Sequence, residues 1–233
     1  MTARYAIYYA PHAASALWRK ACAWLGRDAV TGEAVARPYV AGLDGLDIDD
    51  LTADPRHYGF HATLKAPFEL AEGRTEAELL AAAADFAAGL QAFEARIAPA
   101  ALGRFLAFRL HDSEAEMQAL HAACVRAFEP FRALLSDADL ARRRKAPLTL
   151  EQDVRLVAWG YPYVFEDFRF HMTLTGSIRE DALRERVLAA LRAHFAEESG
   201  LHRFDGVAVF RQTDRQAPFD ILERFTFRAA VTA

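Results

Sequence analysis

The chain has 233 residues, a formal net charge of −4 and a sequence pI of about 6.1, with 53% apolar and 26% charged residues. This composition is typical of a soluble globular protein and excludes a disordered or collagen-like chain, and no apolar run is long enough to predict a membrane span. The mild acidity disfavours a long nucleic acid as the main ligand, because proteins that bind nucleic acids usually carry a basic face.

Apolar periodicity and helix-cap signals predict strands and helices interspersed along the first half of the chain. The patterns predict a strand over 4–10, a helix over 13–25, an acidic turn-rich loop over 41–56 and a strand over about 58–67. Capping-box sequences at 75–78 and 113–116 each predict the start of a helix. Strands over 93–98 and 104–110 lie between these helices, and Pro130 is expected to break the second helix.

The second half repeats this mixture of elements. Residues 136–150 are polar and contain one basic run, Arg142-Arg143-Arg144-Lys145, which we interpret as a solvated helix face rather than a phosphate-binding patch. A strand over about 168–177, a capping box at 177–180 that opens a helix, and strands over 204–211 and 219–230 complete the prediction. Together the elements predict an α+β fold in a single domain spanning 1–233.

Two signals bear on the compartment in which the protein works. Cys22 and Cys124 form no CxxC motif and fall within predicted helices, so we expect two buried thiols and a reducing environment. The first residues, 1–5, lead into a strand pattern without the basic start and apolar core of a signal peptide. A cytoplasmic location is therefore expected.

One five-residue pattern occurs twice, 110 residues apart. Phe60-His61-Ala62-Thr63-Leu64 returns as Phe170-His171-Met172-Thr173-Leu174. Chance placement accounts for roughly 0.4 His-x-Thr pairs in a chain of this composition, so two copies with the same flanking residues are informative. In a strand, alternate side chains share a face, so each His and Thr should point away from the apolar residues around them.

These two motifs resemble those of the two-histidine (2H) phosphoesterase superfamily, in which each of two similar lobes carries one His-x-Thr/Ser motif. The stretch 56–68 and the sequence 171–176 look like a branch of uncharacterised proteins associated with bacterial phosphonate metabolism. The resemblance implies a bilobal, pseudo-two-fold fold with antiparallel sheets flanking a central cleft and helices outside. It also implies that each motif lies on a strand that lines the cleft.

The resemblance further implies a hydrolase that opens a cyclic phosphodiester without a metal or cofactor, with His61, Thr63, His171 and Thr173 as catalytic residues. Histidine suits either the acid or the base role near neutral pH, so two of them can supply both. The threonine hydroxyls would donate to the non-bridging phosphoryl oxygens. Which histidine is the base is left open by the sequence.

Weaker candidates surround the first motif. Lys65 would share the face of His61 and Thr63 in a regular strand, where it could meet a second phosphate. Tyr58 and Arg56 precede the motif and could line the cleft, and Tyr8 on the first strand could stack on a ring. His57 has no third partner that would predict a metal site. The remaining histidines are expected at the surface or at helix ends: His12, His111, His121, His194 and His202.

The favoured substrate is a small phosphorylated metabolite, such as a ribose cyclic phosphate formed in phosphonate breakdown. One alternative is an RNA-end-processing enzyme that acts on 2′,3′-cyclic phosphates or 2′-5′ linkages. A second alternative is a protein that binds a phosphorylated metabolite without turning it over. The oligomeric state, and whether the loop at 41–56 closes over the cleft, are left open by the sequence.

Overall fold

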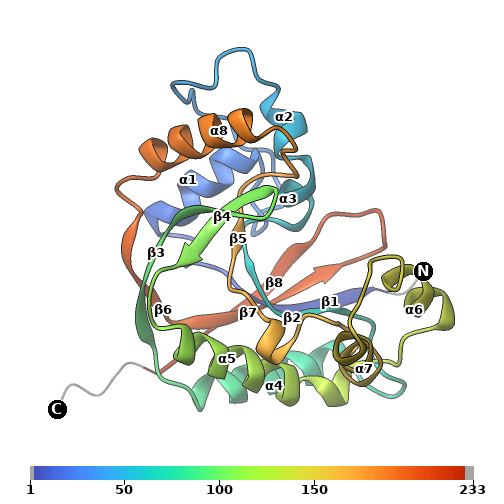
Figure 1. The fold of residues 1–233 in the computed structure, drawn as a ribbon. Coiled ribbons are helices and arrows are strands. Elements are labelled where there is room, and N and C mark those ends of the chain that lie inside the picture. Colours follow the sequence, from blue (N-terminus) through green and yellow to red (C-terminus); the bar gives the residue numbers. More distant parts are fainter. Residues whose placement is uncertain (1–2, 229–233) are drawn as a thin grey trace.

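The computed structural model describes residues 3–228 and consists of one curled, eight-stranded sheet with helices outside it (Figure 1). Every pairing between the eight strands is antiparallel, which confirms the predicted α+β class. The strand order is β6-β3-β4-β5-β2-β1-β7-β8. The strands are β1 Arg4–Tyr9, β2 Ala62–Phe68, β3 Phe93–Leu102, β4 Phe105–Leu110, β5 Met172–Thr173, β6 Gly200–Phe204, β7 Gly206–Gln212 and β8 Asp220–Thr226.

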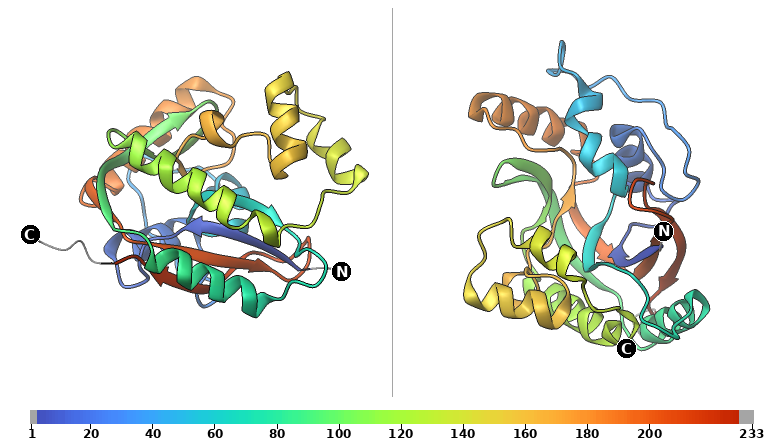
Figure 2. Two further views of the ribbon diagram at one scale, coloured as in Figure 1. Left: turned by 90° about the horizontal axis from the view of Figure 1, so that it is seen from below. Right: turned by 90° about the vertical axis from the view of Figure 1, so that its right-hand side faces the viewer.

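The helices gather into separate groups around the sheet. They are α1 Ala16–Leu25, α2 Ile48–Leu51, α3 Ala53–Tyr58, α4 Glu76–Ala88, α5 Glu114–Ala127, α6 Asp137–Arg143, α7 Leu150–Trp159 and α8 Asp181–His194, with 3-10 turns at Glu129–Phe131 and Phe165–Asp167. Helices α1 and α8 lie together at one end of the molecule and α4 and α5 at the other (Figures 1 and 2). Helices α6 and α7 project beside the central strands.

The two motif strands are neighbours at the centre of the sheet. Ala62 of β2 lies opposite Met172 of β5, with four strands on the β5 side of this junction and four on the β2 side. The sequence predicted sheets flanking a cleft; the structure joins them into one sheet because β2 and β5 hydrogen-bond to each other. Strands from both ends of the chain, β1, β7 and β8, extend the sheet beyond β2.

The alternation predicted for both motifs is confirmed by burial. Phe60, Ala62 and Leu64 are fully buried, as are Met172 and its neighbours Phe170 and Leu174. These side chains join a continuous core with the aromatic residues of β1, β4 and β7. Burying side chains of this size contributes about 1.5–3 kcal/mol each, so the core fixes which face of the motif strands remains for the polar side chains.

Both motif strands are shorter than predicted. Residues 53–58 form α3, so β2 starts at Ala62 instead of residue 58, and β5 has only two residues. Phe165 has a positive φ of 55° and lies in a 3-10 turn, and the chain from there to residue 171 is not paired as a strand. The loop predicted over 41–56 therefore contains α2 and most of α3.

One of the three predicted capping boxes is confirmed. Thr75 and Glu78 cap α4 reciprocally, whereas Ser113 has a positive φ of 51° and makes no side-chain cap. The prediction at 177–180 is also wrong, because α8 begins only at Asp181. Ile178 is buried and its backbone N–H donates to Arg104 O at 2.7 Å, which keeps this stretch extended. A further capping box, Thr149 with Gln152, was not predicted and opens α7.

Strand β3 runs through Pro99, where a break was expected. Pro99 pairs with Phe108 of β4, while the pairing of β3 with β6 ends at Ile97 opposite Gly200. Pro99 therefore has no strand on its second side, and its missing N–H costs no ladder hydrogen bond. The break predicted at Pro130 is confirmed, because α5 ends at Ala127 and a 3-10 turn follows.

The closing part of the chain contains one strand more than predicted. Residues 200–204 form β6, which pairs with β3, and the strand predicted over 204–211 is β7. The last predicted strand corresponds to β8, and its predicted end at 229–230 lies outside the described residues. Cys22 and Cys124 are both free and buried in helices, as expected.

Candidate active site

The pairing of β2 with β5 brings the four motif side chains onto one face of the sheet. With Ala62 opposite Met172, the antiparallel register places His61 opposite Thr173 and Thr63 opposite His171. Side chains directly opposite each other lie about 4.5–5.5 Å apart at Cβ. The result is a square of two imidazoles and two hydroxyls, in which each histidine lies diagonally opposite the other.

Each imidazole is held by a backbone carbonyl two residues before it. The Nδ1 of His61 lies 2.9 Å from Gly59 O, and the Nδ1 of His171 lies 2.6 Å from Arg169 O. A carbonyl oxygen can only accept, so in both rings Nδ1 carries the proton. This contact fixes the tautomer and the ring orientation, and it leaves the Nε2 atom of each neutral ring without a proton.

Burial keeps both rings neutral at neutral pH. Desolvation lowers the pKa of His61 to about 4, opposed by its hydrogen bond to Gly59 and assisted by the charge of His171. Desolvation also lowers the pKa of His171, with a further contribution from the guanidinium of Arg109. The ring of Tyr8 stacks on His61 at a centroid distance of 3.9 Å and helps to keep water from it.

A groove follows the square and consists of two cavities. The first, of about 370 Å³, is lined by His61, Thr63 and Thr173, and the second, of about 420 Å³, by His171 and again Thr63. Tyr161 and Ala66 also line both cavities. The two cavities therefore meet at Thr63, and the chain from α6 to the 3-10 turn at Phe165–Asp167 supplies the wall opposite the sheet.

Two of the four predicted substrate-binding residues line this groove. Tyr8 and Tyr58 belong to the first cavity, and Tyr58 lies between Phe219, at a centroid distance of 5.3 Å, and His61, at 6.1 Å. Tyr8 lies opposite Thr63 on β1, so it shares the face of the motif side chains. Both rings could contact a sugar or a base placed above the square.

Lys65 does not line the groove. Its side chain is buried, and Nζ donates to Val125 O at 3.0 Å and to Glu129 at 2.7 Å, both contributed by the α5 region. The register between β1 and β2 shifts between the pairs Tyr8–Thr63 and Ile7–Lys65, so the strand is not regular as the sequence-based prediction assumed. Lys65 therefore anchors α5 to β2.

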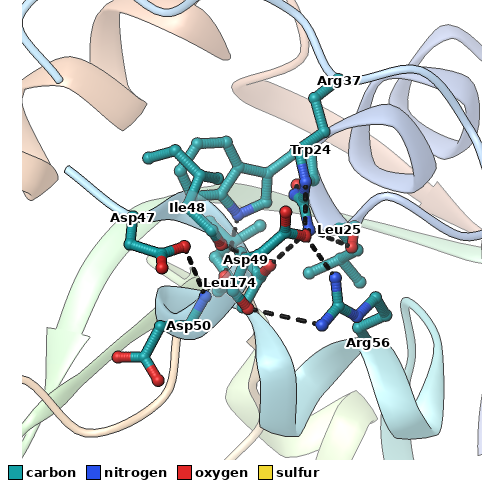
Figure 3. A network of polar contacts seen from close by, with 10 residues as sticks. Trp24, Leu25, Arg37, Asp47, Ile48, Asp49, Asp50, Arg56 and Leu174 are labelled. Carbon is teal, nitrogen blue, oxygen red and sulfur yellow. Dashed lines mark hydrogen bonds and ion pairs between the residues drawn. The ribbon is translucent and has the colours of Figure 1, made fainter. Parts of the chain in front are cut away.

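Arg56 also lies outside the groove. It binds Asp49 at 2.5 Å, and Arg37 binds the same carboxylate at 2.8 Å (Figure 3). The network of Figure 3 extends to Trp24, whose indole N–H donates to Leu174 O at 2.8 Å, directly after Thr173. It thereby fixes the segment before the first motif against the strand that carries the second.

The prediction that His121 lies at the surface or at a helix end is wrong. His121 is buried, stacks on Phe168 at 3.9 Å and accepts a hydrogen bond at Nε2 from the backbone N–H of Phe165. Burial lowers its pKa to about 4. His121 thus supports the turn that covers the second cavity, and it reaches the groove from α5.

Four residues with charged or aromatic side chains that line the first cavity were not predicted from the sequence: Arg4, Arg142, Arg143 and Tyr161. The signal for two of them was the basic run at 142–145, which was interpreted as a solvated face. Arg143 instead turns toward the groove and lies over the ring of Tyr161 at 5.4 Å. Arg4 and Tyr161 carried no pattern that distinguishes them in the sequence.

Gly59 offers a test of the way His61 is held. Its φ of 76° and ψ of 175° form a conformation almost confined to glycine, and a Cβ would lie 2.6 Å from Ala29 Cβ. We expect Gly59→Ala to lower the free energy of unfolding by about 2–4 kcal/mol and to displace the carbonyl that holds His61. Urea denaturation measures the first effect. The second is measured by the hydrolysis of a cyclic phosphodiester, the activity that the resemblance implies.

The control for this variant is Gly73→Ala. Gly73 has a similar φ of 79°, but a Cβ there meets nothing within 4 Å. Gly73→Ala should therefore lower the free energy of unfolding only through the strain of a positive φ, without a steric clash and without loss of activity. Equal effects of the two substitutions would contradict a special role for Gly59.

Metal-binding clusters and membrane-spanning helices are both absent from the described part of the chain. Within 3–228, no group of three or more His, Cys, Asp or Glu side chains is arranged to hold a metal ion. Over the same range, none of the helices combines the length and the apolar character that crossing a membrane requires.

Comparison with known proteins places the chain in a family. A family described as a protein of unknown function, DUF1045, matches residues 63–220, which is more than half of the chain. The chain belongs to the DUF1045 family. The matched region includes Thr63, His171 and Thr173 and begins two residues after His61, so it contains three of the four residues of the square.

Curated relatives are longer than this chain. It is 38% identical over 231 residues to a protein of Janthinobacterium sp. (strain Marseille) named ribose 1,5-bisphosphate phosphokinase PhnN, covering 96% of this chain and 51% of that protein. A protein of the same name from Laribacter hongkongensis (strain HLHK9) is 38% identical over 225 residues, covering 93% and 50%. This DUF1045 chain therefore spans about half the length of the curated relatives it matches.

A solved structure is also similar to the chain as a whole. It is TT0787 of Thermus thermophilus, with 16% sequence identity and a TM-score of 0.44 over 99% of this chain and 100% of that one.

Proposed function

We propose that the protein is a metal-independent, two-histidine phosphodiesterase that hydrolyses a small cyclic phosphodiester. One observation carries the proposal. Two imidazoles, each oriented by a backbone carbonyl at Nδ1, lie with two threonines on one polar face of a sheet whose other face is core. Membership of the 2H phosphoesterase superfamily is part of the same proposal.

The reaction needs a base and an acid on opposite sides of the phosphorus. The Nε2 of His61 takes a proton from water as the water oxygen attacks phosphorus. The bond from phosphorus to one ring oxygen breaks, and the Nε2 of His171 gives its proton to that oxygen. The products are a phosphate monoester and a free hydroxyl, and the two histidines exchange roles in the reverse direction.

The assignment of the base to His61 follows from its surroundings. Its ring is covered by Tyr8, and its pKa of about 4 keeps Nε2 unprotonated in the free enzyme. An anionic substrate in the groove would raise the pKa of both rings, so His171 can hold a proton in the complex.

The threonines are suited to stabilise the charge on phosphorus. Thr63 Oγ1 lies 3.3 Å from His61 Nε2 in the free protein, and Thr173 lies opposite His61 in the register. When a phosphoryl group occupies the square, both hydroxyls can donate to its non-bridging oxygens. Donors fixed in this way stabilise the transition state without having to reorganise.

The names of the relatives fit a small phosphorylated sugar better than a nucleic acid. They describe proteins that act on ribose 1,5-bisphosphate and are twice as long as the matched region. The present sequence contains no GxxxxGK(S/T) phosphate-binding loop of P-loop kinases, so we do not extend the phosphokinase activity to it. We propose a ribose cyclic phosphate, such as one formed in phosphonate breakdown, as the substrate.

A phosphorus NMR screen of cyclic phosphodiesters tests the proposal. We expect conversion of a ribose cyclic phosphate to a monoester in the presence of EDTA, and none by the His61→Ala, His171→Ala double variant. Preference for RNA ends, with an affinity that falls steeply with salt, would instead favour the RNA-processing alternative. Tight binding without conversion across the panel would favour a metabolite-binding protein.

The pH dependence of kcat/KM should show where the two histidines titrate. Both pKa values are lowered from 6.5 in the free protein, so the form in which one imidazole is protonated and the other is neutral is most abundant below pH 6.5. We expect a bell-shaped profile with its maximum below pH 6.5 and a fall of about tenfold per pH unit on the alkaline side. A maximum at about pH 8 in initial-rate measurements would contradict this assignment.

A further inference from the structure

One end of the groove is strongly basic. The cavity lined by His61, Thr63 and Thr173 is also lined by Arg4, Arg142 and Arg143, and its lining includes no carboxylate. The protein as a whole has a net charge of −4, so the basic character is local. The hydrolysis proposed for the His–Thr square assigns no role to these guanidinium groups.

Of these three arginines, Arg143 most clearly lacks an anion. Its Nε is buried without a hydrogen-bond partner, and within residues 3–228 its side chain makes no ion pair. Its neighbours in the basic run differ, because Arg142 pairs with Asp139 at 2.5 Å and Arg144 with Asp153 at 2.6 Å. A half-buried guanidinium with an unpaired Nε and no anion is unfavourable, so a site of this kind favours a negatively charged ligand.

Arg4 faces the same cavity from the sheet. Its guanidinium donates to Gln212 through Nε at 2.7 Å and lies over the ring of Phe219 at 5.6 Å, and it too makes no ion pair among the described residues. Burial lowers the pKa of Arg143, and the charges of Arg142 and Arg4 lower it further, while Tyr161 and Asp139 act in the opposite direction. Arg142 and Arg4 therefore disfavour the charged form of Arg143, which an anion in this cavity would stabilise.

The position of this cluster relates it to the square. Arg4 is on β1, on the same face as Tyr8, and Arg143 ends α6 on the opposite wall. Both line the cavity of about 370 Å³ that holds His61, a volume suited to one sugar with its phosphates rather than to an oligonucleotide. A ligand that reaches both groups needs two anionic centres separated by a short carbon skeleton.

We propose that the substrate is a cyclic phosphodiester that carries a second phosphate, as a monoester, and that Arg143, Arg4 and Arg142 bind this second phosphate while the cyclic phosphate lies on the His–Thr square. The inference rests on the proposed function and names its substrate class. A ribose 1,2-cyclic phosphate with a phosphate on C5 has this chemistry. Guanidinium groups suit the role because they donate two parallel hydrogen bonds to phosphate oxygens.

The test compares two substrates that differ only in the second phosphate. Initial rates are measured with ribose 1,2-cyclic phosphate and with its 5-phosphate, using the wild type, Arg143→Gln, Arg143→Lys and Arg144→Gln. We expect the wild type to prefer the 5-phosphate by about 10–100-fold in kcat/KM, as one or two charge-assisted hydrogen bonds would give. Arg143→Gln should reduce this ratio toward one, Arg143→Lys should retain part of it, and Arg144→Gln should keep the wild-type ratio.

A binding measurement separates this inference from the proposed function. Ribose 5-phosphate should raise the thermal midpoint of the wild type and of Arg144→Gln, and should do so much less for Arg143→Gln. If neither cyclic phosphate is hydrolysed while this protection is seen, the proposed function fails and the phosphate subsite stands. Equal kcat/KM for both substrates in the wild type, or an equal loss on both in Arg143→Gln, would overturn the inference.

Discussion

Replacing His61 or His171 with alanine is expected to lower kcat/KM for the cyclic phosphodiester by about two to four orders of magnitude. Each substitution removes one partner of the acid–base pair, while the carbonyl of Gly59 or Arg169 that held the ring remains. The double variant should lose little more than either single variant, because acid and base act on the same proton-transfer step. Initial rates followed by phosphorus NMR give the comparison.

His111→Ala is the matched control, because His111 is an exposed histidine at the end of β4 and outside both cavities of the groove. It should retain the wild-type rate. Circular dichroism and thermal midpoints establish that each variant is folded, which matters for His61 because Tyr8 stacks on its ring. EDTA-resistant hydrolysis by the double variant at the wild-type rate would remove the basis of the mechanism.

The protein is expected to lose stability steeply as the pH falls from 6.5 to about 4. His121, His61 and His202 have pKa values of about 4 in the folded protein, against 6.5 for a free imidazole, chiefly because burial disfavours their charged forms. The unfolded chain therefore binds more protons than the folded protein in this range, and the free energy of unfolding decreases as the pH decreases. His121 is 2% exposed, and its titration alone lowers the free energy of unfolding by about 3 kcal/mol between neutral pH and about pH 4.

His121→Gln isolates this contribution. A glutamine oxygen can still accept the hydrogen bond from the backbone N–H of Phe165, but it does not titrate. Urea unfolding between about pH 5 and pH 6.5 should show a slope smaller than that of the wild type by up to about 1.4 kcal/mol per pH unit. His12→Gln, at an exposed position, serves as the control, and an unchanged slope in His121→Gln would contradict the prediction.

Strand alternation predicted part of the site but not all of it. The two His-x-Thr motifs were found because a strand exposes alternate residues, and their apolar neighbours are buried as this alternation requires. The prediction that Lys65 lines the groove was wrong because it relied on the same alternation. The register shift between β1 and β2, which redirects the strand after Thr63, depends on a partner strand more than fifty residues away.

The basic run at 142–145 shows a different limit. Four adjacent cations in a polar stretch predict a solvated face, and Arg142 and Arg144 do pair with carboxylates at the surface. Arg143 differs because it makes no ion pair among the described residues and lies over the ring of Tyr161 in the groove, whereas Arg142 lines the same cavity while paired with Asp139. Helical periodicity gives the relative directions of the side chains, but which direction faces the groove depends on where the helix is packed.

The sequence alone determined that the chain is α+β, that two polar pairs would share one face of their strands, and that both pairs would be framed by core. These features follow from local periodicity, which each segment carries by itself. Only the tertiary structure decided that the two strands are hydrogen-bonded neighbours, that Tyr8 covers His61 and that Arg4 and Arg143 face the same cavity. Those contacts join residues that are distant in the chain, and the packing of the whole core selects them.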